Sequence, residues 1–211
     1  MTQNDYVWYA SYGSNINKER FLCYIKGGTP IGSSKREMGC RDQSLPKKEK
    51  SFRLPHQLYF AKESRRWQKQ GVAFIDLAQH ESFKTYSKMY LVTKEQFFDI
   101  VSQENSMNHF EVDLDDVIKN GTQVIRDAWY GNLLYIDTED GYPIFTFSSP
   151  FRFDSSETNK PSDAYFKTII IGLKNEIGLT TEQVYHYFSE VPGIKTNFSK
   201  EELRHLIINA R

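Results

Sequence analysis

The chain has 211 residues, of which 39% are hydrophobic and 26% charged, a composition typical of a soluble globular protein rather than a disordered one. Its 27 basic and 27 acidic side chains balance, so no overall charge favours binding to nucleic acid or to an anionic membrane. No apolar run approaches the roughly 20 residues that span a bilayer. We therefore expect a protein that binds neither nucleic acid nor membranes. The composition leaves the oligomeric state open.

Cysteine and histidine usage predicts neither disulfides nor a metal. Cys23 and Cys40 are too few for a disulfide framework, which favours a reducing compartment. The five histidines form no His-Glu-x-x-His or His-x-His pattern. The first residues lack the basic start and apolar stretch of a signal peptide. We therefore expect a cytoplasmic protein with no metal site.

The first half of the chain is predicted to form strands joined by polar loops. The apolar, aromatic run over residues 6–12 predicts a strand, and residues 17–25 predict a helix. The polar, glycine-rich stretch over 27–50 predicts a loop with at most one short strand. Apolar runs predict further strands at 58–61, 71–77 and 88–93.

Helices and one hairpin are predicted in the second half. Thr93 is expected to cap a helix, and 114–119 predicts a short one. Strands at 129–136 and 142–147, separated by residues 137–141, predict a hairpin. The last segment predicts helices at 162–176, 181–189 and 199–210, the last with a Ser199–Glu202 capping box. The strands come first in the chain, the helices come later, and no linker divides them. This order predicts one α+β domain over 1–211. Its sheet is expected to be small, mixed and β-barrel-like, with flanking helices.

The stretch Tyr12-Gly13-Ser14-Asn15 lies where the first strand turns into the first helix. Backbone N–H groups converge at such a helix N-terminus and favour an anion or a developing oxyanion. Gly13 is expected to adopt a backbone conformation closed to other residues, while Ser14 and Asn15 add short hydrogen-bonding side chains. A simple helix-capping turn is the alternative interpretation.

The string Tyr12-Gly13-Ser14-Asn15 after an aromatic strand resembles the signature of the γ-glutamylcyclotransferase-like family, with Ile16 in place of the usual leucine. Residues 65–67 followed by Gly71-Val72-Ala73 are similar to a loop and central strand of that family. Residues 165–179 resemble its C-terminal helix. The resemblance implies the γ-glutamylcyclotransferase-like fold.

The resemblance also implies a catalytic glutamate at a helix end, in a pattern written Leu-Asp-x-x-Glu-Gly. The corresponding stretch is 98–105, where Glu104 is the candidate and Asp99 lies farther from it than in the usual spacing. Asn105 replaces the usual glycine, and asparagine tolerates a left-handed helix end better than most residues. A polar insert near 105–128, which the family lacks, is expected to shape, cover or block the pocket. Two other carboxylates stay open as alternatives: Glu95 and Glu111.

The activity that the resemblance implies is cyclisation of a γ-glutamyl amide. The α-amine of this small-molecule substrate attacks the γ-amide carbon, 5-oxoproline forms, and an amine or amino acid leaves. This chemistry requires no metal or other cofactor, only a carboxylate of raised pKa that moves a proton. We expect Phe97, Phe98 and Phe110 to provide its apolar surroundings.

Substrate binding is assigned by the same resemblance to the turn and to one helix residue: Tyr12, Gly13, Ser14, Asn15 and Tyr165. A competing hypothesis is a non-catalytic module of the same fold that binds small carboxylates, because a fold does not fix a function. The position of the catalytic carboxylate beside the turn, or its exposure to solvent, distinguishes the two.

Overall fold

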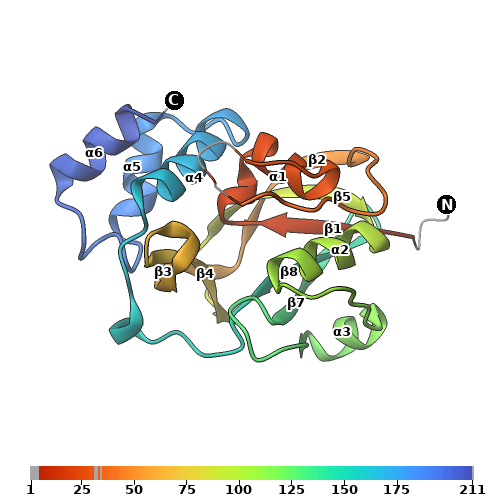
Figure 1. Cartoon of the computed structure of the whole chain (residues 1–211). Helices are drawn as coiled ribbons and strands as arrows, with labels where there is room; N and C mark the ends of the chain where they lie inside the picture. Colours follow the sequence, from red (N-terminus) through yellow and green to blue (C-terminus); the bar gives the residue numbers. More distant parts are fainter. Residues whose placement is uncertain (1–4, 31–32, 34, 211) are drawn as a thin grey trace.

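The computed structural model describes residues 5–30, 33 and 35–210, which form a mixed sheet, a separate hairpin and flanking helices (Figure 1). The strands are β1 (Tyr6–Ser11), β2 (Lys48–Leu54), β3 (His56–Ser64), β4 (Gln70–Gln79), β5 (Thr85–Thr93), β6 (Thr122–Val124), β7 (Asn132–Glu139) and β8 (Tyr142–Ser148). The α-helices are α1 (Lys18–Lys26), α2 (Lys94–Glu104), α3 (Leu114–Asn120), α4 (Asp163–Asn175), α5 (Thr181–Ser189) and α6 (Lys200–Ile208). Short 3-10 turns are η2 (Ser14–Ile16), η3 (Arg65–Trp67) and η4 (Ser155–Glu157).

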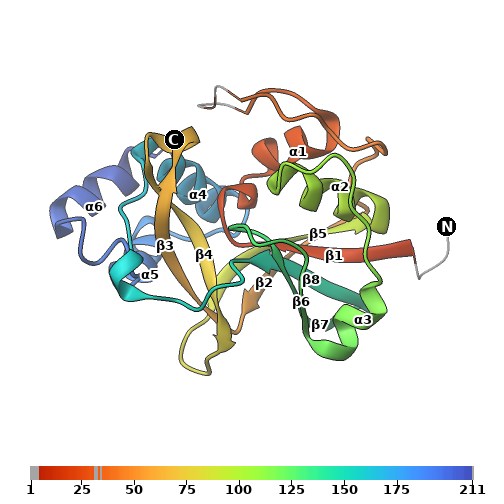
Figure 2. The same ribbon diagram turned by 60° about the horizontal axis from the view of Figure 1, so that its bottom comes forward.

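The main sheet has six strands in the order β2-β5-β1-β8-β7-β6. β1 pairs antiparallel with β5 and parallel with β8, so the sheet is mixed. β3 and β4 form a two-stranded hairpin of their own. Figures 1 and 2 show α4, α5 and α6 gathered on one side of the molecule, with the β3–β4 hairpin between them and the sheet. The predicted α+β class, with a mixed sheet and flanking helices, is confirmed.

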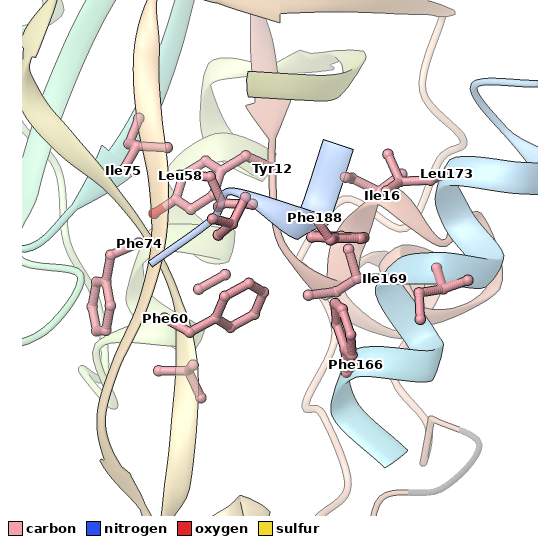
Figure 3. Close-up of a cluster of buried hydrophobic side chains, with 14 of the residues drawn as sticks. Tyr12, Ile16, Leu58, Phe60, Phe74, Ile75, Phe166, Ile169, Leu173 and Phe188 are labelled. Carbon is pink, nitrogen blue, oxygen red and sulfur yellow. The ribbon is translucent and has the colours of Figure 1, made fainter. Parts of the chain in front are cut away.

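β1 is buried along its whole length because both faces of the strand are covered. Trp8 and Ala10 contribute to a core shared with the hairpin and the C-terminal helices. Val7 and Tyr9 point into a second core under α1, α2 and α3. Alternation in a strand sends successive side chains to opposite faces, so a strand between two cores must be apolar throughout. Figure 3 shows the first core, where Phe60 of the hairpin lies near Phe166 of α4, with ring centroids 5.7 Å apart.

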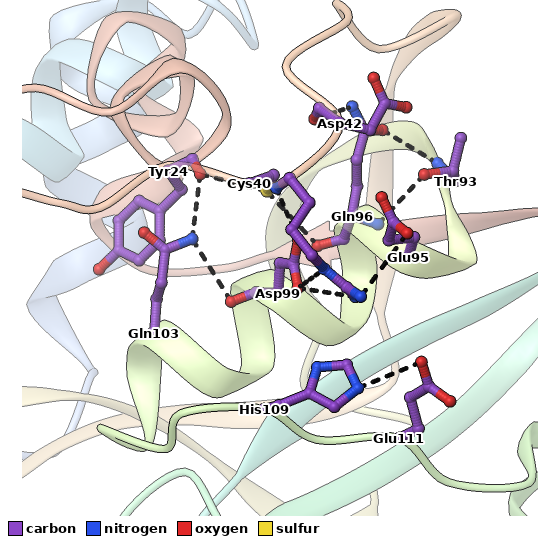
Figure 4. A network of polar contacts seen from close by, with 11 residues as sticks. Tyr24, Cys40, Asp42, Thr93, Glu95, Gln96, Asp99, Gln103, His109 and Glu111 are labelled. Carbon is purple, nitrogen blue, oxygen red and sulfur yellow. Dashed lines mark hydrogen bonds and ion pairs between the residues drawn. The ribbon is translucent and has the colours of Figure 1, made fainter.

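Side-chain caps fix where the helices begin. Thr93 and Gln96 form a reciprocal capping box at α2, as the sequence predicts for the Thr93 cap. Gln96 also donates to the carbonyl oxygens of Asp42 and Ser44, which ties the long loop before β2 to α2 (Figure 4). The predicted Ser199–Glu202 box at α6 is confirmed.

Several predicted boundaries are wrong for identifiable reasons. β2 spans 48–54: its first three residues lie in the stretch over 27–50, for which at most one short strand was predicted, and the other four lie beyond it. The sequence gives no apolar run here, because this strand is polar and largely uncovered. The second hairpin turns at Asp140 and Gly141, whose φ angles of 53° and 79° define a tight two-residue turn. β7 therefore runs to Glu139, and it begins at Asn132 rather than at 129.

The polar insert near 105–128 is partly structured. It contains α3, which packs on the second core through Leu114 and Val117, and β6, which pairs with β7 at the sheet edge. Gly121, with φ of 76°, ends α3 in the left-handed region that favours glycine. Within the described part of the chain, no helix is both long and apolar enough to cross a bilayer.

Gly172 allows α4 to approach the η2 turn. A Cβ at this position would lie 2.7 Å from the backbone nitrogen of Asn17 and 2.8 Å from Cγ2 of Ile16. We expect Gly172→Ala to lower the free energy of unfolding by about 1–3 kcal/mol, because overpacking displaces the helix or the turn. Urea unfolding of this variant is compared with Asn175→Ala, an exposed change in the same helix expected to stay within about 0.5 kcal/mol of wild type. A Gly172→Ala protein of unchanged stability would show that the two elements can separate at no cost.

Candidate active site

A cavity of about 510 Å³ opens where β1 ends. Its walls come from the turn after β1, from η3 and β4, from the end of α2, from the segment before β7 and from α4. The candidate catalytic residue and the five predicted substrate-binding residues all line it: Glu104, Tyr12, Gly13, Ser14, Asn15 and Tyr165. Elements far apart in the sequence thus meet at one cavity. Its size suits a small molecule.

The turn after β1 presents backbone N–H groups at the edge of the cavity. The amide of Ile16 donates to the Gly13 carbonyl at 3.0 Å and closes η2. The amides of Ser14 and Asn15 come first in this turn, so by its geometry no carbonyl within the turn is available to them. Asn17 then caps α1 by accepting from the amide of Arg20 at 3.1 Å. The predicted strand–turn–helix arrangement is present, with a 3-10 turn inserted.

Gly13 does not adopt the left-handed conformation that most often requires glycine, since its φ is −107°. A Cβ here would instead lie 3.3 Å from the Tyr165 hydroxyl and 3.7 Å from the Ala73 Cβ. Glycine is therefore favoured by the close approach of α4 and β4 to the turn.

Glu104 ends α2 beside this turn. The Asn15 side-chain amide donates to Glu104 Oε1 at 3.4 Å and to the Tyr9 hydroxyl at 3.5 Å. The partly exposed carboxylate lines the cavity. The Asn15 side chain therefore links the carboxylate of Glu104, the candidate catalytic residue, to the turn after β1.

The two alternative carboxylates lie elsewhere. Glu95 is in the first turn of α2, exposed, with an oxygen 3.7 Å from a guanidinium nitrogen of Arg41. Glu111 follows α2 in an exposed loop, 3.4 Å from the His109 ring nitrogen (Figure 4). Of the three candidates, Glu104 alone is among the residues that line the cavity.

Asn105 holds the end of α2 in a way that the sequence did not predict. Its φ is −94°, so it is not left-handed; the left-handed residue is Ser106, with φ of 52°. The buried Asn105 side chain donates to the carbonyls of Val101 at 3.1 Å and Tyr130 at 3.0 Å. Asparagine is thus explained by a link between α2 and the opposite wall.

The rings around Glu104 differ from those expected. Phe97 and Phe98 pack in the second core, and Phe110 contacts Phe98 edge-on at 6.0 Å, so these three do not line the cavity. The aromatic lining is instead Tyr9, Tyr12, Tyr24, Trp67, Trp129, Tyr130, Phe147 and Tyr165. Neither Tyr9 nor Tyr130 was predicted as a site residue. The alternation of side chains along β1 could have indicated that Tyr9 faces the site. No local pattern indicates this for Tyr130, which follows the insert.

The tyrosine hydroxyls of the cavity are held by backbone groups. Tyr12 donates to the Phe147 carbonyl at 2.8 Å, and Tyr130 donates to the Ala73 carbonyl at 3.0 Å. Tyr165 accepts from the Ala73 amide at 3.2 Å. Burial raises the pKa of Tyr9, Tyr12, Tyr130 and Tyr165, and the nearby Glu104 carboxylate raises that of Tyr9 further. These phenols are therefore neutral hydrogen-bonding groups at physiological pH.

The end of the insert and the two residues that follow it form one wall of the cavity. Residues 126–130 all line it, and Arg126 Nη1 donates to the Asn105 carbonyl at 2.5 Å. Trp129 meets Phe74 edge-on, with ring centroids 6.3 Å apart. The expected influence of the insert on the pocket thus takes the form of a wall. Among the described residues, no group of three or more His, Cys, Asp or Glu side chains is placed to hold a metal ion.

Comparison with known proteins gives one sequence relative and structures of similar shape. No protein-family model matches the chain. It is 36% identical over 200 residues to Histone deacetylase 5 of Arabidopsis thaliana, a match covering 87% of this chain and only 30% of the length of that relative. Solved structures of a gamma-glutamyl cyclotransferase and of an uncharacterised human protein each align with a TM-score of 0.47 and 20% identity. Both alignments cover 97% of this chain and 99% of the other. A TM-score below 0.5 does not establish a common fold, so function is inferred below from the cavity residues.

The buried tyrosines make stability sensitive to alkali. The pKa values of these phenols are raised in the folded state. Their contribution to the free energy of unfolding is therefore complete below about pH 10, the pKa of tyrosine in the unfolded chain, and is lost as the pH rises above that value. We expect the urea midpoint to fall steeply between about pH 10 and pH 11.5. Phenolate absorbance at 295 nm should rise for the buried tyrosines only as the protein unfolds. Smooth titration of all 13 tyrosines in the folded protein would contradict this expectation.

Proposed function

We propose that the chain catalyses the intramolecular cyclisation of a γ-glutamyl amide to 5-oxoproline, with release of an amine or amino acid. The observation that carries the proposal is the position of Glu104, in the cavity wall and hydrogen-bonded through Asn15 to the turn after β1. The sequence of that turn resembles the signature of the γ-glutamylcyclotransferase-like family. The structure adds a cavity at the same residues.

Glu104 is the proton carrier in the proposed reaction. It takes a proton from the α-ammonium of the substrate, and the freed amine attacks the γ-carbonyl carbon. A new C–N bond closes the five-membered ring, and the original γ-amide C–N bond breaks. Glu104 passes that proton to the departing nitrogen and, ionised again, accepts the second proton that the ring nitrogen must lose to give the neutral lactam. This second proton leaves with the released amine, which departs as an ammonium ion. No covalent bond to the protein forms, so one carboxylate is sufficient.

The turn after β1 stabilises negative charge that develops on the carbonyl oxygen. The amides of Ser14 and Asn15 are donors at the start of η2, beside the carboxylate that handles the proton. Donors of this kind contribute a few kcal/mol to lowering the barrier in other acyl transfers. The enclosing rings keep the flexible glutamyl chain curled, so that amine and carbonyl meet, and this saves entropy at the transition state.

A binding module without turnover is the second candidate. The observation in its favour is that Phe97, Phe98 and Phe110 do not enclose Glu104, so the apolar surroundings expected for a proton carrier do not come from them. In this case the cavity binds a small amino acid or carboxylate and releases it unchanged. Deacetylation is not proposed, because the match to the relative of that name covers 30% of its length.

Replacing the carboxylate separates the two candidates. We expect wild type to release 5-oxoproline from at least one member of a panel of γ-glutamyl amino acids, glutathione and γ-glutamyl amines. Glu104→Gln should lower kcat by about 10²–10⁴-fold, because the amide cannot move the proton.

Glu95→Gln and Glu111→Gln serve as matched controls. Both remove a carboxylate outside the cavity and should leave turnover within about twofold of wild type. Far-UV circular dichroism checks that each variant is folded. Full turnover in Glu104→Gln would reject the assigned residue, and no turnover across the panel by wild type would favour the binding module.

A further inference from the structure

Arg20 is a deeply buried cation in the cavity wall. It lies in the first turn of α1, its residue is only 6% exposed, and it lines the cavity. Its Nε donates to Ser14 Oγ at 2.8 Å, and its guanidinium carbon lies 5.5 Å from the centre of the Trp67 ring. The buried Nη1 has no hydrogen-bond partner in the part of the chain that the structure describes.

The surroundings of Arg20 lack the compensation that buried charges normally have. Within the described residues, no carboxylate oxygen lies within 4.0 Å of its guanidinium. Lys88 is the instructive contrast: it is 8% exposed and pairs with Glu49 at 3.2 Å and Glu176 at 3.3 Å. An unpaired buried charge is costly, and a cation in the first turn of a helix also opposes the helix dipole. Both costs disappear when an anion binds beside Arg20.

Ser14 completes a set of donors next to Arg20. Because its Oγ accepts from Arg20 Nε, the hydroxyl hydrogen is available to donate elsewhere. The Ser14 amide opens the η2 turn and adds a backbone donor. The guanidinium, the hydroxyl and the amide together suit a planar, singly charged group such as a carboxylate.

We propose that Arg20 and Ser14 bind the α-carboxylate of the substrate, which makes Arg20 the residue that requires an amino-acid head group. This inference rests on the proposed function for the identity of the ligand. Asn15, the residue after Ser14, is hydrogen-bonded to Glu104, so consecutive residues of the turn contact the cation and the carboxylate that line the cavity. An α-amino acid carries its ammonium and carboxylate on one carbon atom, and a cation and a carboxylate contacted by consecutive residues match that arrangement. The substrate class is therefore γ-glutamyl compounds with both α-groups free.

Binding is tested first, without any need for turnover. 5-Oxoproline and 2-pyrrolidinone are the same lactam with and without the carboxylate, and their affinities are measured by isothermal titration calorimetry. We expect wild type to prefer 5-oxoproline by about 10–100-fold, as for a hydrogen-bonded charge pair. Arg20→Gln should lose that preference, Arg20→Lys should retain part of it, and Ser14→Ala should lose a smaller part.

Arg41→Gln is the matched control, since it removes an exposed guanidinium that pairs with Asp99 at 3.0 Å outside the cavity. It should leave the preference unchanged. Urea unfolding accompanies each titration, and Arg20→Gln is expected to be at least as stable as wild type without ligand. If that variant does not fold, the Ser14→Ala and Arg20→Lys affinities carry the test. Equal wild-type affinity for the two lactams, or no measurable binding of either, would overturn the inference.

Turnover separates failure of this inference from failure of the proposed function. 4-Aminobutanamide lacks the α-carboxylate but can close the same ring, so wild type should use it with a kcat/KM about 10–100-fold below that of γ-glutamyl amide. Arg20→Gln should abolish the difference, chiefly through KM for the γ-glutamyl compound. Arg20-dependent lactam binding without turnover would reject the enzyme and keep the carboxylate site. Turnover with a preference that survives in Arg20→Gln would keep the enzyme and reject the role of Arg20.

Discussion

Burial of β1 on both faces is the constraint on which the cavity depends. Each side of the strand is covered by a different hydrophobic core, so its direction and depth cannot shift without exposing apolar surface on one side or the other. The chain leaves the sheet at Tyr12 with its position fixed, and the amides of the following turn are fixed with it. Contacts at the far side of the turn are equally tight, because α4 approaches it through Gly172. Preorganised donors are the kind that lower a reaction barrier, since no energy is spent on orienting them during the reaction.

The charged side chains of Arg20 and Glu104 line the cavity and are contacted by neighbouring residues of the turn after β1. Ser14 contacts Arg20, and Asn15 contacts Glu104, so two consecutive residues lead to opposite charges. Four tyrosines, Tyr9, Tyr12, Tyr130 and Tyr165, line the same cavity, and burial raises their pKa values and keeps them neutral. In a partly enclosed site of this kind each charge acts over a longer range than in water. A ligand with separated charges gains from both side chains, whereas a neutral ligand leaves Arg20 uncompensated.

The sequence predicted those features that are decided locally and missed those decided by tertiary contacts. The turn after β1 and the Thr93 cap follow from spacing and side-chain chemistry within a few residues, whereas the helix end at Glu104 was implied by the family resemblance. The predicted left-handed conformation of Asn105 was wrong. Its side chain is hydrogen-bonded to the carbonyl of Tyr130, 25 positions away, and this distant contact explains why asparagine occupies the position. Arg20 gave no signal, since an arginine in the first turn of a polar helix is usually exposed. The extent of β2 was missed because its polar residues pair with β5 through backbone groups, which leave no apolar pattern in the sequence.

The proposed reaction places the two ends of the substrate against different parts of the chain. The glutamyl end faces the turn after β1, α1 and α2, all of which are anchored in the two cores. The other side of the cavity is lined by residues 126–130, which belong to or directly follow the insert and are held to α2 through Asn105. Of these, Trp129 is more than a third exposed, and its ring meets that of Phe74 edge-on. A rigid end for the common head group and a less enclosed end for the departing amine would let the insert change without disturbing the chemistry. Under the proposed function, selectivity for the head group is therefore assigned to Arg20 and Ser14, and selectivity for the amine is assigned to the wall formed by residues 126–130.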